Sequence, residues 1–238
     1  MKTLCIAGKN NIAVNVLKYA IDKYSNNLNI IGICNRTDNG YDNFQLSYKR
    51  ILKQCSIKEV SLDDIYEIED LIFLSLEFDR LIKIKKFKSK KLFNVHFSLL
   101  PKYRGMYTAA WVILNNEKYT GVTLHEIDDG IDTGNIIDQL KYEISNEMTC
   151  EDIYIKNIEL GTEIIKKNFD LLLNDKYKSY KQNDNDSSYY GKNSIDYNNL
   201  YIMLDEPKEI IDRKLRAYTF TYYQKPIYLN DRIIFKKQ

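Results

Sequence analysis

The stretch Phe93–Ile137 decides how this chain is interpreted, and it reads FNVHFSLLPKYRGMYTAAWVILNNEKYTGVTLHEIDDGIDTGNII. Asn94 and His96 stand two residues apart in an apolar run, so both side chains lie on one face if the run is a strand. The stretch ends in an acidic, Gly-punctuated loop that contains Asp132. An Asp beside a His can fix the tautomer and the charge of the imidazole. Together these three side chains suit acyl transfer to an amine.

Alternating strand-like and helix-like segments surround this stretch and predict an α/β fold. Residues 3–7 have the pattern of a buried strand, Gly8 ends it, and Asn10 or Asn11 can cap the helix that follows. Further strand candidates are 29–34, 71–76, 91–97, 121–127 and 135–144, with helix-like segments at 45–54 and 108–114. Strands that alternate with helices indicate a Rossmann-like, doubly wound, mostly parallel sheet that is covered on both faces.

The second half of the chain predicts a long helix and a small C-terminal unit. Thr149 begins an amphipathic helix, and Asp152 completes a capping box. Residues 184–199 are polar and are expected to form a connection that leaves the main domain. We therefore expect a catalytic domain over residues 1–182 and a β-rich C-terminal subdomain over residues 183–238.

The C-terminal subdomain is expected to contain a helix and a hairpin. Residues 207–216 have helical spacing, and strand candidates at 225–229 and 232–236 are joined by Asn230-Asp231, which suits a tight turn. An apolar hairpin of this size must bury one face on its own domain or on a partner subunit. The sequence therefore predicts a homodimer.

Composition sets limits on the class of protein. The 238 residues are enough for one substantial core, and 35 basic against 33 acidic residues give no reason to expect a nucleic-acid or membrane partner. The basic run Lys83–Lys91 has the pattern of a solvated connecting segment. No apolar stretch approaches the length of a bilayer span, and the N-terminus enters a strand-like run without a secretory signal. A cytoplasmic location is expected.

Several common sites are not expected. The four cysteines form no C-x-x-C pair, which argues against a zinc site and against a disulfide framework. The turn after the first strand lacks G-x-G-x-x-G and P-loop patterns, so bound NAD or ATP is not expected. The loop 128–134 lacks EF-hand spacing, so no metal is expected. A phosphate-bearing substrate can still approach the helix N-terminus beside Lys9. His125, on an alternating strand, is expected on the solvent side or behind the catalytic residues.

Asn94, His96 and Asp132, in this order, carry a resemblance to the formyltransferases that use 10-formyltetrahydrofolate. That family shows Asn-x-His, a Ser-Leu-Leu-Pro loop, Arg/Lys-Gly and a later Asp-x-Gly-x-Asp-Thr-Gly loop, and each piece stands in this chain. The resemblance is strong over residues 70–140 and weaker over the opening β-α-β unit. Phe97 and Met106-Tyr107-Thr108 depart from better-known members, and the string HFSLLPKYRGMYT is similar to a subgroup that formylates dTDP-linked amino sugars.

The resemblance implies a reaction and roles for its residues. A formyl group would pass from 10-formyltetrahydrofolate to the amine of a dTDP-linked amino-dideoxyhexose for O-antigen or surface-glycan biosynthesis. A 4-amino-4,6-dideoxyglucose is expected ahead of a 3-amino sugar. Asn94 would donate a hydrogen bond to the developing oxyanion, and His96 would stabilise that oxyanion or act as the base. Asp132 would orient His96 and relay protons.

The resemblance also implies two sets of binding residues. The walls of the folate slot would be Leu76, Phe78, Ile127, Asp128 and Asp129. The nucleotide sugar would approach Lys9, Asn10, Lys102, Tyr103, Arg104, Gly105, Met106, Tyr107 and Tyr222, although ordinary packing explains any single tyrosine equally well. Two alternatives stay open: formylation of another small amine such as glycinamide ribonucleotide, and a catalytically silent protein that binds folate or nucleotide sugar.

Overall fold

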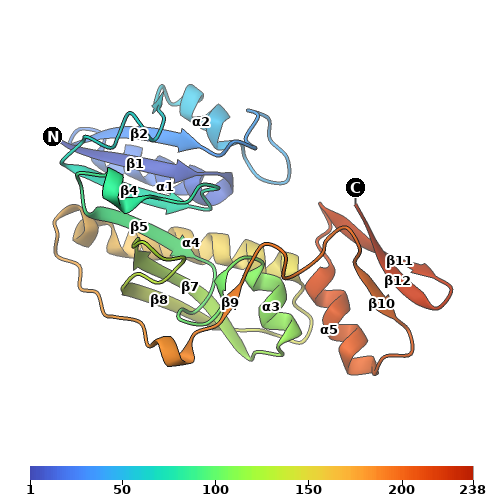
Figure 1. Ribbon diagram of the computed structural model, residues 1–238. Coiled ribbons are helices and arrows are strands. Elements are labelled where there is room, and N and C mark those ends of the chain that lie inside the picture. The colour runs from blue at the N-terminus through green and yellow to red at the C-terminus, as the bar shows by residue number, and fades with distance from the viewer. Residues whose placement is uncertain (238) are drawn as a thin grey trace.

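The computed structural model describes residues 1–237 and has a seven-stranded sheet at its centre, in the order β3-β2-β1-β4-β5-β7-β8 (Figure 1). The strands are β1 (Lys2–Gly8), β2 (Leu28–Cys34), β3 (Lys58–Glu59), β4 (Leu71–Leu76), β5 (Lys91–His96), β7 (Tyr119–Glu126) and β8 (Ile136–Glu143). The first five run parallel, whereas β7 is antiparallel to both β5 and β8. The predicted α/β fold with a mostly parallel sheet is confirmed.

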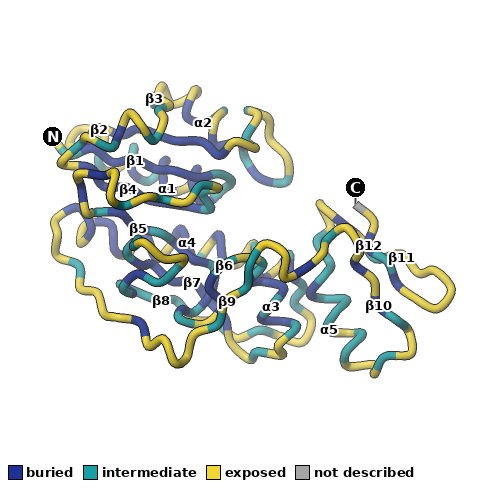
Figure 2. The backbone as a smooth tube through the Cα atoms, viewed as in Figure 1, coloured by how far each residue is buried: buried dark blue, intermediate teal, exposed yellow. Residues whose placement is uncertain are grey.

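Figure 2 shows that the central strands are mostly buried, which follows because their side chains are apolar on both faces of the sheet. Side chains of α1 (Asn10–Tyr24), α2 (Tyr48–Gln54) and α4 (Cys150–Leu173) share one core with one face of the sheet. On the other face, extended segments and the 3₁₀ turn η1 (Ile84–Lys86) surround a second core. On this face, Ile65 and Phe87 from these segments cover the sheet in place of a long helix.

The helix α4 begins at the predicted capping box. The Thr149 hydroxyl accepts a hydrogen bond from the Asp152 amide at 3.2 Å, and the Asp152 carboxylate accepts one from the Thr149 amide at 2.8 Å. Two N–H groups that the helix cannot satisfy internally are thereby paired. The cap fixes the start of the helix that covers the middle of the sheet.

The chain leaves β1 toward β2 on one side and returns to β4 on the other. Ligands in open α/β sheets bind at such a switch point, beyond the carboxyl ends of the strands. A Cβ on Gly8 would lie 2.0 Å from the Leu76 carbonyl oxygen, so the two strands approach closely only because this residue is glycine. Just beyond the strands, Asn10 and Glu77 adopt left-handed φ values of 59° and 57°. Adjacent β5 ends at His96, so the catalytic candidates lie at the same edge.

The C-terminal subdomain packs a small sheet on two helices. The sheet order is β10 (Tyr201–Met203), β12 (Arg232–Lys237) and β11 (Gln224–Leu229), and the helices are α3 (Thr108–Leu114) and α5 (Lys208–Tyr218). Ile202, Ile233 and Phe235 are buried against the helices in a separate core. The predicted hairpin is confirmed, because Leu229 pairs with Arg232 across Asn230-Asp231.

An extended segment, residues 174–190, connects α4 to the C-terminal subdomain and runs back along the sheet (Figure 1). It includes η2 (Asp184–Asp186) and ends in β9 (Tyr189–Tyr190), which pairs with β6 (Arg104–Gly105). The polar stretch 184–199 was expected to leave the main domain, yet its first part lies on the loop that contains Arg104. Its polar groups pair with the backbone of that loop, and the Arg104 amide donates a hydrogen bond to the Ser188 carbonyl at 2.8 Å. The boundary between residues 182 and 183 stays a prediction.

Candidate active site

The carboxylate of Asp132 lies between two imidazole rings. Asp132 Oδ2 is 3.5 Å from His96 Nδ1, and Asp132 Oδ1 is 3.6 Å from His125 Nε2. Asn94 and His125 face each other across the antiparallel pair β5–β7, and Asn94 Nδ2 is 3.0 Å from His125 Nε2. The structure therefore brings the three predicted catalytic residues together and adds a second histidine.

His96 is buried, and each of its ring nitrogens faces an acceptor. Nε2 lies 2.7 Å from the Tyr103 carbonyl oxygen, while Nδ1 faces the Asp132 carboxylate. These two contacts fix the orientation of the His96 ring.

Asp132 is held in an unusual backbone conformation and in an ionised state. Its φ is 55°, and its Oδ2 accepts a hydrogen bond from the Gly105 amide at 2.9 Å. Burial alone would raise the pKa of this carboxyl group. The charge of His96, the hydrogen bond and charge of His125 and the Gly105 amide outweigh burial and hold the pKa of Asp132 well below its usual range. The site therefore contains a fixed negative charge.

His125 is 2% exposed, so the expectation of a solvent-side position was wrong and the alternative, a place behind the catalytic residues, is what the structure shows. Its Nδ1 lies 2.7 Å from the Glu126 carbonyl oxygen, and its Nε2 lies 3.0 Å from Asn94 Nδ2. The alternating pattern misled because helix α4 packs on one face of β7 and Asp132 lies against the side chain on the other.

The predicted folate residues divide between the two faces of the sheet. Phe78 and Ile127 pack at the edge of the core that lacks a long helix, whereas the Leu76 side chain is fully buried in the core under α1 and α4. Asp128 accepts hydrogen bonds from Gly130 and Thr133 within its own loop, and Asp129 forms an exposed ion pair with Lys85 at 3.7 Å. Because its side chain is buried, Leu76 can meet a ligand at this edge only through its backbone. The role of all five in folate binding stays a prediction.

Three of the predicted sugar-binding residues in the loop 102–107 are already engaged. Lys102 pairs with Glu117 at 3.4 Å, Tyr103 is buried against Tyr190, and the Arg104 guanidinium is buried on Gln182 and Asp184. This arrangement supports structural roles for them.

The other three residues of that loop are placed differently. Gly105 has a φ of 95°, and a Cβ there would lie 2.2 Å from the Tyr190 carbonyl oxygen. Met106 is 45% exposed, and Tyr107 packs edge-on against Tyr197 with ring centroids 4.8 Å apart. Met106 is therefore the member of this set best placed to meet a ligand.

A polar cluster at the ends of β1 and β4 was not predicted. Asn10 Nδ2 lies 3.2 Å from Glu77 Oε2 and 2.7 Å from the Tyr154 hydroxyl, which itself donates to Glu77 Oε1 at 2.8 Å. Burial raises the pKa of Glu77, against the opposing effects of Lys9, Tyr154 and Asn10. The side chain of Asn10 is thus engaged, and Lys9 supplies the positive charge beside this edge. No local motif marks Glu77 or Tyr154, which come from distant segments.

Tyr222 belongs to an aromatic cluster formed by Phe44, Phe220, Tyr222 and Tyr223. The ring of Phe44 lies 4.6 Å from that of Tyr222 and 5.6 Å from that of Tyr223, measured between centroids. Phe44 comes from the loop after β2, whereas the other three come from the C-terminal subdomain. The cluster therefore joins the two parts of the chain. Phe44 lies in a polar loop without a recognisable pattern, so its role could not be found from sequence.

Two features are absent from the described part of the chain, residues 1–237. Among these residues, no group of three or more His, Cys, Asp or Glu side chains is arranged to hold a metal ion. None of the helices in that range is both long and apolar enough to cross a membrane.

Comparison with known proteins identifies the family. A sequence profile described as formyl transferase matches residues 73–168. WlaRD, a sugar 3N-formyl transferase crystallised with dTDP and 5-N-formyl-THF, is 46% identical with a TM-score of 0.92, and the match covers 99% of this chain and 85% of that one. The N-formyltransferase from Helicobacter canadensis, in complex with folinic acid and dTDP-3-aminofucose, is 44% identical with a TM-score of 0.91, covering 96% of this chain and 84% of that one.

Curated relatives are longer than this chain. The methionyl-tRNA formyltransferase of Finegoldia magna is 30% identical over 174 residues, which cover 68% of this chain and 54% of that protein. The chain spans only about one fifth to one half of the first curated relatives it matches. The near full-length match to WlaRD at 46% identity is decisive, and it shows that this chain belongs to the formyl transferase family of enzymes, in which it is similar to sugar N-formyltransferases.

Proposed function

We propose that this enzyme transfers the formyl group of 10-formyltetrahydrofolate to the amine of a dTDP-linked 3-amino-3,6-dideoxyhexose. The observation that carries the proposal is the Asp132 carboxylate held between His96 and His125 beside Asn94. Two enzymes of 46% and 44% identity, whose descriptions name a 3N-formyl transferase and dTDP-3-aminofucose, support the substrate. This reverses the order expected from sequence, which put the 4-amino sugar first. A role in surface-glycan biosynthesis and a cytoplasmic location stay predictions.

The first chemical step needs a stabilised oxyanion. The lone pair of the sugar amine forms a bond to the formyl carbon, and the formyl oxygen takes up negative charge. The Asn94 amide, whose Nδ2 lies 3.0 Å from His125 Nε2, can donate an N–H to that oxygen. His96, held between the Tyr103 carbonyl and Asp132, is the second group placed to stabilise that oxygen. Both groups stabilise the tetrahedral intermediate more strongly than they stabilise the neutral formyl group of the donor.

The second step moves one proton. The amine nitrogen becomes positively charged on attack and must lose a proton, while N10 of the folate must gain one as its bond to the formyl carbon breaks. The ionised Asp132 carboxylate can accept that proton, directly or through water, and return it to N10. Transfer then balances: a sugar formamide and tetrahydrofolate form from the amine and the formyl donor, and the enzyme recovers its charge.

The nucleotide serves as a handle for positioning. Lys9 lies at the strand edge that ends in the catalytic residues, and a helix N-terminus follows it, so a diphosphate is favoured there. The aromatic cluster offers the exposed rings of Tyr222 and Tyr223 to a thymine base. Binding energy from these contacts would place the amine beside the formyl carbon.

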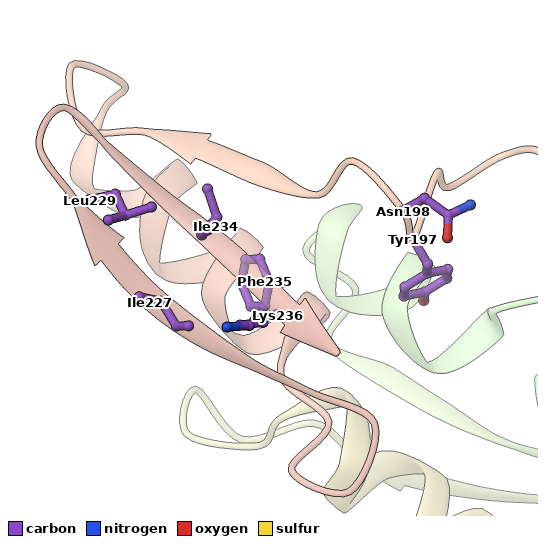
Figure 3. Close-up of a pocket in the computed structure, with 7 residues that line it drawn as sticks. All are labelled: Tyr197, Asn198, Ile227, Leu229, Ile234, Phe235 and Lys236. Carbon is purple, nitrogen blue, oxygen red and sulfur yellow. The ribbon is translucent and has the colours of Figure 1, made fainter. Parts of the chain in front are cut away.

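We also propose that the enzyme is a homodimer joined through the C-terminal sheet. Tyr201, Ile234 and Ile227 stand in register across β10, β12 and β11, on the face opposite the buried Ile233. Figure 3 shows Ile227, Leu229 and Ile234 on the same sheet, and these residues border a shallow cavity of about 470 Å³ with Tyr197 and Phe235. An apolar row on a three-stranded sheet suits a second copy of the same face.

Steady-state rates with a panel of acceptors test the proposed function. We expect the highest kcat/KM for dTDP-3-amino-3,6-dideoxyhexoses, a lower value for dTDP-4-amino-4,6-dideoxyglucose, and no formylation of glycinamide ribonucleotide or initiator tRNA. The free amino sugar should react far more slowly than the dTDP-linked one, because it lacks the handle. Preference for the 4-amino sugar would overturn the proposed regiochemistry. Absence of turnover with every acceptor would favour the silent-protein alternative, with Asp132→Asn as the inactive reference.

A further inference from the structure

Gln182 uses both ends of its side-chain amide inside the protein, although it lies in an otherwise exposed connecting segment. It is 5% exposed, whereas Lys181 and Asn183 on either side of it are exposed. Its Nε2 donates to the Asp132 carbonyl at 2.9 Å and to the Gly134 carbonyl at 2.7 Å. Both hydrogens of the Gln182 NH₂ group therefore form hydrogen bonds to the loop that carries the Asp132 carboxylate.

Arg104 fixes which way the Gln182 amide points. The guanidinium donates from Nε at 3.2 Å and from Nη2 at 2.8 Å to Gln182 Oε1, and Nη2 also donates to Asp184 at 2.7 Å. Arginine has only donors, so the amide oxygen must face it and the NH₂ group must face the two carbonyls. Arg104 is itself 8% exposed, and its charge is balanced by Asp184.

The two contacts of Gln182 meet again at the Asp132 carboxylate. Arg104 directly precedes Gly105, whose amide donates to Asp132 Oδ2 at 2.9 Å. Gln182 therefore holds the backbone of Asp132 on one side and, through Arg104, the loop that binds its carboxylate on the other. Asp132 needs such support because its φ of 55° is a conformation that a residue with a side chain rarely adopts.

We propose that Gln182, locked by Arg104, is a positioning residue that holds the Asp132 carboxylate between His96 and His125. It touches neither substrate nor reacting atoms and acts through Asp132 alone. Its kinetic consequence rests on the proposed function, whereas its effect on the two imidazoles does not.

Two variants of Gln182 and one control separate positioning from stability. Gln182→Leu removes all four hydrogen bonds at similar size. Gln182→Glu keeps the acceptor for Arg104 but, when ionised, cannot donate to either carbonyl. Asn185→Ala changes an exposed residue of the same segment and is the matched control.

The kinetic arm expects a loss confined to turnover. Gln182→Leu should lower kcat on the order of 10- to 100-fold, the range for displacing a catalytic group by about 1 Å, with KM for both substrates within about threefold of wild type. Gln182→Glu should recover part of its deficit relative to wild type as the pH falls, because a protonated carboxyl group regains one donor. Asn185→Ala should behave as wild type.

The second arm uses no substrate. The chain has only two histidines, and both contact Asp132, so ¹H–¹³C spectra of the imidazole Cε1–H groups report on the carboxylate from both sides. In Gln182→Leu, both resonances and their pH titrations should move toward those of Asp132→Asn. If they coincide with wild type in the folded variants, or if kcat falls less than twofold, the proposal is wrong. Wild-type protein that shows no turnover would refute the proposed function while leaving this spectral test intact. Should Gln182→Leu fail to fold, Gln182→Glu, which retains the Arg104 contact, provides the same comparison.

Discussion

At the scale of single residues, the charge pattern around Asp132 is the basis of the proposed chemistry. One carboxylate lies within 3.6 Å of two imidazole nitrogens and accepts an amide hydrogen bond from Gly105. We predict that His96→Ala and Asp132→Asn each lower kcat on the order of 100-fold or more, the range for acid–base and electrostatic groups. Calorimetric titration with 5-formyltetrahydrofolate should show nearly unchanged binding, because the expected folate walls are other residues. Near-native turnover of either variant would contradict the assignment.

Glu77 gives a second residue-scale prediction, about pH. Burial raises its pKa above the ordinary value, so the folded protein binds this proton more tightly than the unfolded chain does. Stability from this group is therefore fully present at about pH 4 and is lost as the pH rises through the folded-state pKa. In Glu77→Gln the change in melting temperature relative to wild type should be more favourable at about pH 7.5 than at about pH 4. Equal changes at both pH values would show that the carboxyl group is not destabilised by burial.

The proximity of Asn94, His96 and Asp132 could be predicted from sequence because their pattern is local. Asn94 and His96 lie on one strand, and Asp132 lies in the loop 128–134, which has glycines at positions 130 and 134. Gln182 and Glu77 could not be predicted, because each acquires its role from partners more than 40 positions away. An isolated Gln or Glu in a polar stretch carries no sign of which carbonyl or hydroxyl it will meet.

At the scale of elements, α4 shows how one cap supports several contacts. The helix is capped by Thr149 and brings Tyr154 to Glu77 and Asn168 to Asp138. We predict that Thr149→Ala lowers the free energy of unfolding by about 1 kcal/mol, the usual cost of losing an N-cap. Thr149→Ser should retain most of that stability, because its hydroxyl can still accept from Asp152. Urea unfolding followed by circular dichroism measures both, and equal stability of the two variants would contradict a capping role.

The regular elements followed from periodicity, whereas the short ones did not. The buried strands are continuous apolar runs, and the amphipathic α4 repeats with a period of 3.6 residues, and a sequence displays both directly. Strands β6 and β9 have two residues each and exist only because Arg104 and Tyr189 pair across 85 positions of chain. Helix α2 begins at Tyr48, later than expected, because Ser47 accepts from the Arg50 amide and caps it. Pairing over such distances is a property of the fold and leaves no local period.

At the scale of the whole molecule, the C-terminal sheet is the part whose exposed face lacks an intramolecular explanation. One face buries Ile202 and Ile233 completely against the helices, which anchors the sheet to the catalytic part. The other face presents Tyr201 at 55% and Ile227 at 38% exposure, in register with Ile234 between them. Three adjacent apolar side chains facing water favour association.

We predict that Ile227→Glu and Ile234→Glu convert a dimer into a monomer. A carboxylate in the middle of a self-complementary apolar face would meet its symmetry mate, so two like charges would be desolvated together in each dimer. Leu81→Glu is the matched control, because Leu81 is 77% exposed and lies outside this sheet. Sedimentation velocity at micromolar protein should show a dimer for wild type and the control, and a monomer of unchanged circular dichroism for both sheet variants. A monomeric wild type would end the dimer proposal. Dimeric Glu variants would place the interface on another surface, since a face this small cannot tolerate the buried charges.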